Sequence, residues 1–138
     1  MLDSYRFFLY KTIPGKKPGK RDKLPISPKT LEVFDSTDPA HFVDLETARE
    51  LVGAGAAEGV GWSVAPPYFF LDIDGAAEET GGAWKDIAAR LCGLFPGCFV
   101  EVSQSGKGLH VIGRYEGPEP DHKKKRPSYH GVDLELYT

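Results

Sequence analysis

The sequence predicts an α+β fold, with a mostly antiparallel sheet and helices packed on one face. Two observations carry this prediction. Short apolar segments with strand alternation recur along the chain. Two other segments, residues 38–52 and 84–91, instead repeat their apolar residues at helical spacing. From residue 60 onward, the expected order is strand, strand, helix, strand, strand, loop, strand, which is typical of such a sheet.

The chain length bounds the number of domains. A chain of 138 residues, of which 41% are hydrophobic, can bury one core. We therefore expect one domain, residues 1–138, made of a leading segment, 1–58, and a core segment, 59–138, that carries the chemistry.

The leading segment predicts one strand, one arm and one helix. Residues 5–10 have the composition of a short strand, and residues 14–28, rich in Lys, Gly and Pro, predict an ordered or mobile arm. Asp38 followed by Pro39 is a favoured helix start, and the helical spacing of apolar residues continues until Gly53.

The core segment begins with two expected strands, Val60–Ala65 and Tyr68–Asp74, which would form a hairpin at Pro66-Pro67. Trp84 begins the apolar pattern of a second helix, and Gly93 ends that helix. Three more strands are expected, with a Pro- and Lys-rich loop before the last: Cys98–Ser103, Leu109–Tyr115 and Val132–Tyr137.

Charge is unevenly distributed along the chain. The formal net charge is −3, but residues 1–30 carry eight basic and two acidic side chains, a balance of +6, which leaves −9 for the remainder. A second basic run spans residues 123–126. An acidic body with basic segments suits a protein that binds metal at one place and polyanions at another. The alternative is that both basic runs are solvated loops.

The sequence gives no sign of export or membrane insertion. Residues 1–11 lack the apolar core of a signal peptide, and no segment has the ~18 apolar residues of a membrane span. The two cysteines match neither a zinc-site spacing nor a disulfide framework. We therefore expect a cytoplasmic protein without a membrane partner.

Carboxylates occupy one face of two expected strands. In the segment 69–74, alternation places Asp72 and Asp74 on the face opposite the apolar side chains, about 6.5–7 Å apart along the strand. Asp133 and Glu135 repeat this pattern in the last strand. Neighbouring strands would bring these groups together around a hard divalent cation. Either strand alone is equally typical of a solvent-exposed sheet face.

The loop between the fourth and fifth expected strands has the composition of a phosphate-binding loop. It offers two hydroxyls, two glycines and one lysine, and His110 follows in the next strand. The spacing is not that of a Walker A loop. We take six residues as candidate nucleotide-binding groups: Ser103, Ser105, Gly106, Lys107, Gly108 and His110.

Taken together, these motifs resemble those of the archaeo-eukaryotic primase superfamily, in particular the bifunctional primase-polymerases of phages and plasmids. The matching segments are Phe70–Gly75, Ser103–His110 and Leu134–Tyr137. The resemblance implies a palm-like (RRM-like) sheet and a DNA primase or polymerase that transfers nucleotides to a 3′-hydroxyl. Since relatives continue beyond this point, we expect a fragment truncated at its C-terminus, with limited activity alone.

The resemblance also implies site residues and partners. Asp72, Asp74 and Glu135 would hold two divalent ions, Mg²⁺ or Mn²⁺, and His110 would join them in catalysis while contacting the nucleotide phosphates. The implied partners are NTP or dNTP, a DNA template and primer, and a helicase domain in the same protein or in trans.

Two alternatives stay open. A non-catalytic module could use the same loop and basic arm to bind nucleotides or single-stranded nucleic acid. A metal-dependent nuclease could use the same carboxylates, although the sequence lacks a His-hydrophobic-His triad near a catalytic tyrosine.

Overall fold

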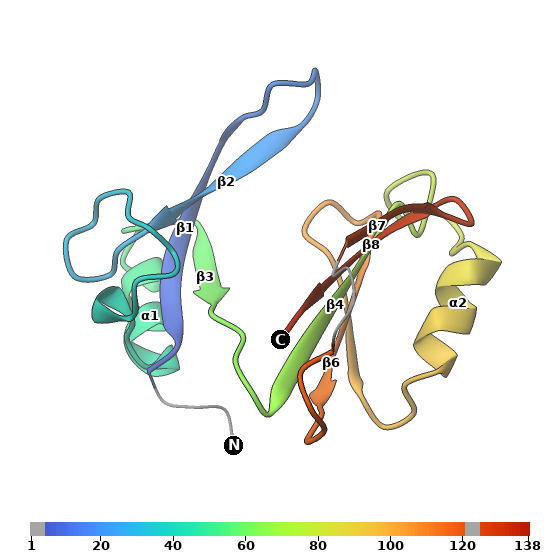
Figure 1. Ribbon diagram of the computed structural model, residues 1–138. Coiled ribbons are helices and arrows are strands. Elements are labelled where there is room, and N and C mark those ends of the chain that lie inside the picture. Colours follow the sequence, from blue (N-terminus) through green and yellow to red (C-terminus); the bar gives the residue numbers. More distant parts are fainter. Residues whose placement is uncertain (1–4, 121–124) are drawn as a thin grey trace. The chain divides into compact units, whose positions relative to one another are not determined.

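The computed structural model describes residues 5–120 and 125–138, which divide into two compact units on either side of the Ser63–Val64 bond. Each unit contains an antiparallel sheet and one α-helix among its described residues (Figure 1). The predicted α+β class with antiparallel pairing is confirmed, although the strands belong to two sheets instead of one. No helix in the described residues is long and apolar enough to span a membrane.

The first unit contains a three-stranded sheet, in the order β2-β1-β3, within its described residues. The strands are β1, Phe7–Pro14, β2, Arg21–Ile26, and β3, Gly59–Trp62. Helix α1, Leu45–Gly53, packs on this sheet through Ala48, which is fully buried. The expected arm is thus part of a β1–β2 hairpin.

The helix expected from Asp38 is divided into two parts. A 3₁₀ turn, η1, spans Pro39–His41 and is capped by Asp38, whereas α1 has its own cap, the Asp44 side chain, which accepts a hydrogen bond from the backbone of Thr47 at 2.7 Å. That bond and a second from the Thr47 hydroxyl hold the pKa of Asp44 below its ordinary value. The chain is extended between the two because Val43 pairs with Phe7 of β1 through two backbone hydrogen bonds.

The expected hairpin at Pro66-Pro67 is wrong, because its two strands belong to different sheets. β3 pairs with β1, with Trp62 opposite Phe7, while β4, Tyr68–Asp74, lies at the centre of the second sheet. The glycines of β3 favour this partner, since a Cβ on Gly59 would lie 2.5 Å from the ring of Tyr10 on β1.

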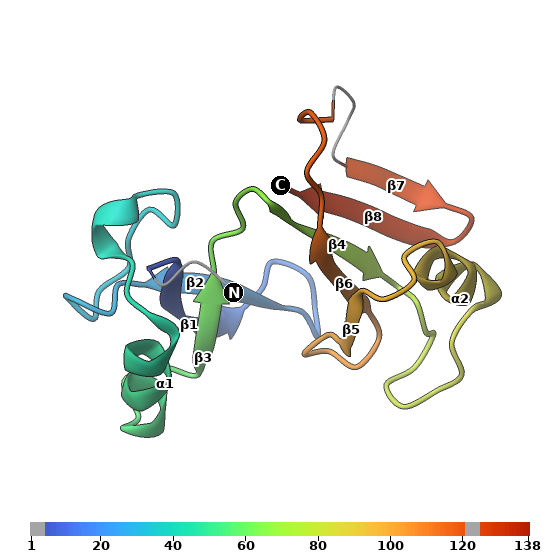
Figure 2. The same ribbon diagram turned by 90° about the horizontal axis from the view of Figure 1, so that it is seen from below.

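The second unit contains a five-stranded sheet, in the order β5-β6-β4-β8-β7, within its described residues (Figures 1 and 2). Its elements are α2, Asp86–Gly93; β5, Phe99–Val102; β6, Leu109–Arg114; β7, Lys125–Tyr129; and β8, Val132–Tyr137. Helix α2 covers one face, where Ala88 and Leu91 pack on Ile73, Val111 and Val132.

The sequence predicted a loop where the structure has β7. That prediction is wrong, because β7 pairs with the outer edge of β8. Pro127 made a strand difficult to predict here, because proline lacks the N–H that a central strand needs. Proline is tolerated in an edge strand, which is the position of β7. Lys123 and Lys124 of the basic run lie outside the described residues, and Lys125 and Arg126 belong to β7.

Candidate functional site

The central strand β4 brings the predicted carboxylates and the histidine together. Asp72 lies directly opposite His110 of β6 on one side and Glu135 of β8 on the other, and Asp74 lies opposite Asp133. Directly opposed residues in antiparallel strands have Cα atoms about 4.5–5.5 Å apart and project to the same face. These side chains therefore share the face that α2 does not cover, while Ile73 between the two aspartates is fully buried.

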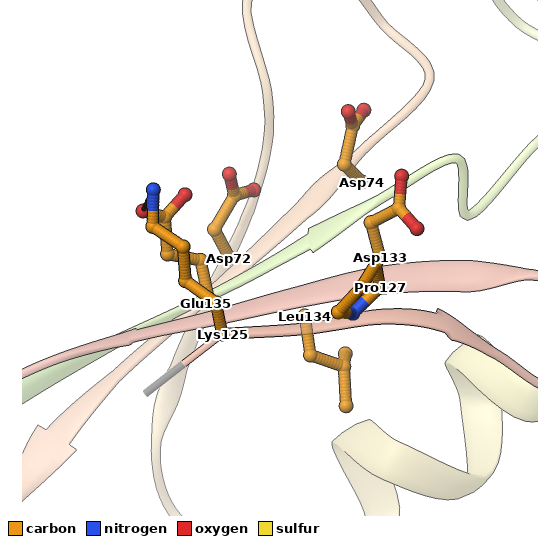
Figure 3. Close-up of a pocket in the computed structure, with 7 residues that line it drawn as sticks. All are labelled: Asp72, Asp74, Lys125, Pro127, Asp133, Leu134 and Glu135. Carbon is orange, nitrogen blue, oxygen red and sulfur yellow. Dashed lines mark ion pairs between the residues drawn. The ribbon is translucent and has the colours of Figure 1, made fainter. Parts of the chain in front are cut away.

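A shallow depression of about 310 Å³ lies over this face. Four of the described carboxylates line it, together with Lys125, Pro127 and Leu134: Asp72, Asp74, Asp133 and Glu135. In Figure 3, all four carboxylates point to the same side of the sheet. We call this surface the acidic face.

Two basic side chains lie beside carboxylates of the acidic face. The Nζ atom of Lys125 lies 3.0 Å from Oε1 of Glu135. The Nε2 atom of His110 lies 3.5 Å from Oδ1 of Asp72. Because Lys125 is largely exposed while Glu135 is not, this ion pair stabilises the fold little and can open at small cost.

His110 is held from three directions. Its Nδ1–H donates to Oε1 of Glu101 on β5 at 2.9 Å, and its ring packs against Phe70 with centroids 4.6 Å apart. Since a carboxylate only accepts hydrogen bonds, Glu101 assigns the hydrogen to Nδ1. Nε2 is consequently the ring nitrogen that faces Asp72.

Tyr137, at the end of β8, is hydrogen-bonded to Glu135 of the acidic face. Burial raises the pKa of Tyr137 to about 12, with further contributions from its hydrogen bond to Glu135 and from the charges of Glu135 and Asp72. Its ring also contacts Phe70 edge to face. Removing the phenolic proton here would add a further negative charge to a surface that already carries several.

The donor set of the acidic face fits a hard divalent cation in kind, because carboxylate oxygens are the ligands that Mg²⁺ and Mn²⁺ prefer. Within the described residues, no three His, Cys, Asp or Glu side chains are already gathered around one point. Glu135 is turned toward Lys125, and His110 lies beside Asp72. Binding a cation would therefore require side-chain rotation but no change in strand pairing.

The loop between β5 and β6 is a tight, internally bonded turn. The Ser103 hydroxyl accepts a hydrogen bond from Gly108 N at 3.0 Å, and the Ser105 hydroxyl accepts one from Lys107 N at 3.3 Å. Gly106 N donates to the carbonyl of Ser103, and its φ of +76° requires glycine. These N–H groups already have partners, so an anion would meet the hydroxyls and the exposed Lys107 side chain first.

This loop lies at the Asp74 end of the acidic face. A Cβ on Gly108 would lie only 3.1 Å from the carbonyl oxygen of Ile73, the residue between Asp72 and Asp74. The predicted phosphate loop and the predicted carboxylates are thus neighbours in space, although about thirty residues separate them in sequence.

No family model matches the chain. The chain is similar to a DNA primase-polymerase of Nitratiruptor phage NrS-1. The two sequences are 29% identical over 124 residues, which cover 88% of this chain and 17% of the phage protein. The chain therefore spans about a sixth of the length of that relative. The match supports the resemblance to phage primase-polymerases, whereas the wider superfamily stays a prediction.

Two residues that contact the predicted site residues were missed in the sequence: Glu101 and Lys125. Glu101 contacts His110 because β5 pairs with β6 at this position, and its place between Val100 and Val102 is the same alternation that marks the aspartates. Lys125 lies opposite Glu135 in a strand that was expected to be a loop. The alternation could have revealed Glu101, but only the pairing of β7 reveals Lys125.

Proposed function

We propose that this chain carries the catalytic site of a DNA primase-polymerase, which adds nucleotides to a 3′-hydroxyl on a nucleic-acid template. One observation carries the proposal: Asp72, Asp74 and Glu135 project from adjacent strands onto one face. The similarity to the phage primase-polymerase supports it. A role in phage or plasmid replication, a helicase partner and a cytoplasmic location remain predictions of the sequence.

We further propose that Asp72, Asp74 and Glu135 are the ligands of two divalent cations, Mg²⁺ or Mn²⁺. When bound, such ions activate the attacking hydroxyl and stabilise the leaving pyrophosphate. The protein contributes a fixed strand register that keeps the three carboxylates on neighbouring positions. Four carboxylates on one face repel each other, and this repulsion favours cation binding. Glu135 becomes available when its ion pair with Lys125 opens.

The incoming nucleotide is proposed to place its phosphates between the β5–β6 loop and His110. The Ser103 and Ser105 hydroxyls lie 3.1 Å apart and Lys107 is exposed, so they offer two hydroxyls and one cation to the phosphate oxygens. Glu101 accepts a hydrogen bond from Nδ1–H of His110, so Nε2 donates to a phosphate oxygen when the ring carries both hydrogens. The groups that bind phosphate thus lie on β5, β6 and their loop, next to the carboxylates of β4.

The proposal is tested by Asp72→Asn with Asp74→Asn in the protein that carries this chain. Template-directed incorporation of labelled nucleotides under Mg²⁺ or Mn²⁺ should fall by roughly 100-fold or more, because the charge that holds the cations is removed. Glu50→Gln with Asp86→Asn makes a control of equal charge change at two exposed positions outside the acidic face and the β5–β6 loop. Unchanged synthesis by the Asp72 and Asp74 variant overturns the proposal.

The two alternatives predict other outcomes in the same assay. Nucleotide binding that persists in EDTA, with no product under either metal, would indicate a non-catalytic binding module. Strand nicking in the absence of nucleotides would indicate a nuclease. Synthesis that requires metal and the two aspartates separates the primase-polymerase from both.

A further inference from the structure

The most distinctive surface of the first unit is the outer part of the β1–β2 hairpin. β3 pairs with β1 only between Phe7 and Tyr10, whereas β2 pairs with β1 as far as Pro14, opposite Arg21. Residues 11–24 therefore form a two-stranded ribbon that extends past the end of β3 (Figure 1). We call these residues the basic ribbon.

The basic ribbon concentrates positive charge in a chain that is acidic as a whole. It carries six basic residues against the single acid Asp22, a balance of +5, while the whole chain has −3. All six are exposed, and none forms a salt bridge within the described part of the chain: Lys11, Lys16, Lys17, Lys20, Arg21 and Lys23. Glu58 interacts electrostatically with Arg21 and Lys11 at the stem. The charge of the lysines at the tip is therefore the part most available to an external anion.

The tip of the ribbon has a defined turn. Lys20 N donates to the carbonyl of Lys17 at 3.1 Å, with Pro18 and Gly19 between them and a φ of +75° at Gly19. Proline followed by a positive-φ glycine is the sequence of a type II turn. Gly15 N closes the turn by donating to the carbonyl of Lys20 at 2.7 Å. The turn thus fixes the backbone that bears the three tip lysines, Lys16, Lys17 and Lys20.

The stem of the ribbon is held by its own side chains. The Arg21 guanidinium donates to the hydroxyl of Thr12 at 2.9 Å and to its carbonyl at 3.0 Å. The same hydroxyl donates to Glu58 at 2.7 Å. Lys23 lies over the ring of Tyr10, with Nζ 4.7 Å from the ring centroid. A prearranged surface loses less conformational entropy when it binds a ligand.

We propose that the basic ribbon, which belongs to the first unit, binds the phosphate backbone of a nucleic acid. Clustered lysines give strong and sequence-independent attraction to phosphates. A two-stranded β-ribbon is also an element that the major groove of a duplex admits. A membrane surface is less suitable, because Ile13 is the only large aliphatic side chain of the ribbon that is exposed, and it is 39% exposed.

The experiment measures binding of the protein that carries this chain to a fluorescent DNA oligonucleotide, in EDTA, as a single strand and as a duplex. The tip variant is Lys16→Gln, Lys17→Gln and Lys20→Gln. A control of equal charge change is Lys29→Gln, Arg49→Gln and Arg90→Gln, three exposed positions outside the ribbon. Unfolding curves of both variants verify that they fold.

The expected result follows from counterion release. Three phosphate contacts contribute about 2–3 to the slope of log affinity against log salt. Between 50 and 200 mM salt, the original protein should therefore lose roughly 20–40-fold more affinity than the tip variant. The control variant should keep the original slope. Lys16→Arg with Lys17→Arg and Lys20→Arg should keep it too, because the charge remains.

Equal slopes for the tip and control variants overturn the proposal, since they would show an effect of net charge alone. Loss of binding to vesicles of anionic lipid, with DNA binding unchanged, would overturn it in favour of a membrane surface. The tip variant is compared on single-stranded and on duplex DNA. The form of DNA for which it loses affinity is the form that the ribbon binds. Because DNA binding is measured without metal, this test of the ribbon does not depend on the metal-dependent nucleotide incorporation proposed for Asp72 and Asp74.

Discussion

The close approach of Gly108 to β4 predicts that a larger residue at position 108 destabilises the β5–β6 loop. A methyl group at residue 108 would lie 2.9 Å from Oγ of Ser103 and 3.1 Å from the carbonyl oxygen of Ile73. The same Oγ accepts the hydrogen bond from Gly108 N, so it cannot turn away without losing that bond. Gly108→Ala must therefore break the hydrogen bond and displace the loop from β4.

The expected loss of stability is the sum of two terms. Overpacking of a well-packed site destabilises by about 1–3 kcal/mol, and the lost hydrogen bond adds about 0.5–1.5 kcal/mol. Gly93→Ala is the matched control in the same unit, because its Cβ would meet nothing within 4 Å at the end of α2. That substitution should be neutral or stabilising by up to about 1 kcal/mol.

Urea unfolding followed by circular dichroism measures both variants. A Gly108→Ala protein as stable as Gly93→Ala would refute the close packing of loop and strand. A double-mutant cycle sharpens the test. After Ser103→Ala, the Oγ contact is absent, so Gly108→Ala should cost less than in the original protein. Strict additivity would show that Ser103 is not the group that the new methyl meets.

Three further predictions concern the acidic face and its support. Glu101→Gln should loosen the hold on Nδ1 of His110 and change its tautomer populations, which nitrogen NMR detects; an unchanged spectrum would contradict the assigned orientation. Because the pKa of Tyr137 is raised from 10.0 to about 12, its contribution to stability is complete below about pH 10 and is lost as pH rises through 12. Tyr137→Phe should remove this loss of stability when the free energy of unfolding is measured against pH between about 10 and 12. The same pH dependence in both proteins would contradict the raised pKa of Tyr137. Ile73→Ala should destabilise by about 2–5 kcal/mol because the side chain is fully buried, whereas Ile13→Ala at an exposed position should have little effect in the same urea assay.

The strands of the acidic face were predictable because each is half buried. In β4 and β8, alternation separates core residues from carboxylates, and the register places Asp72 opposite Glu135. The position of His110 after its loop was likewise predictable as the start of a strand. Alternation does not show which strands pair with each other. The β3–β4 hairpin was therefore predicted in error.

Other features depend on contacts distant in sequence. Lys125 belongs to an edge strand that contains Pro127, so composition alone indicated a loop. Val43 interrupts the expected first helix because it pairs with Phe7, thirty-six positions earlier in the chain. The predicted metal and phosphate ligands share one unit of the fold.

The acidic face depends on a single register between β4 and β8. Shifting β8 by one residue would replace Glu135 opposite Asp72 with a leucine, Leu134 or Leu136, and would turn its carboxylates toward the core. The register of β8 therefore cannot shift by one residue without loss of the carboxylate arrangement. Insertions or deletions within β8 should be tolerated far less than changes of side chain.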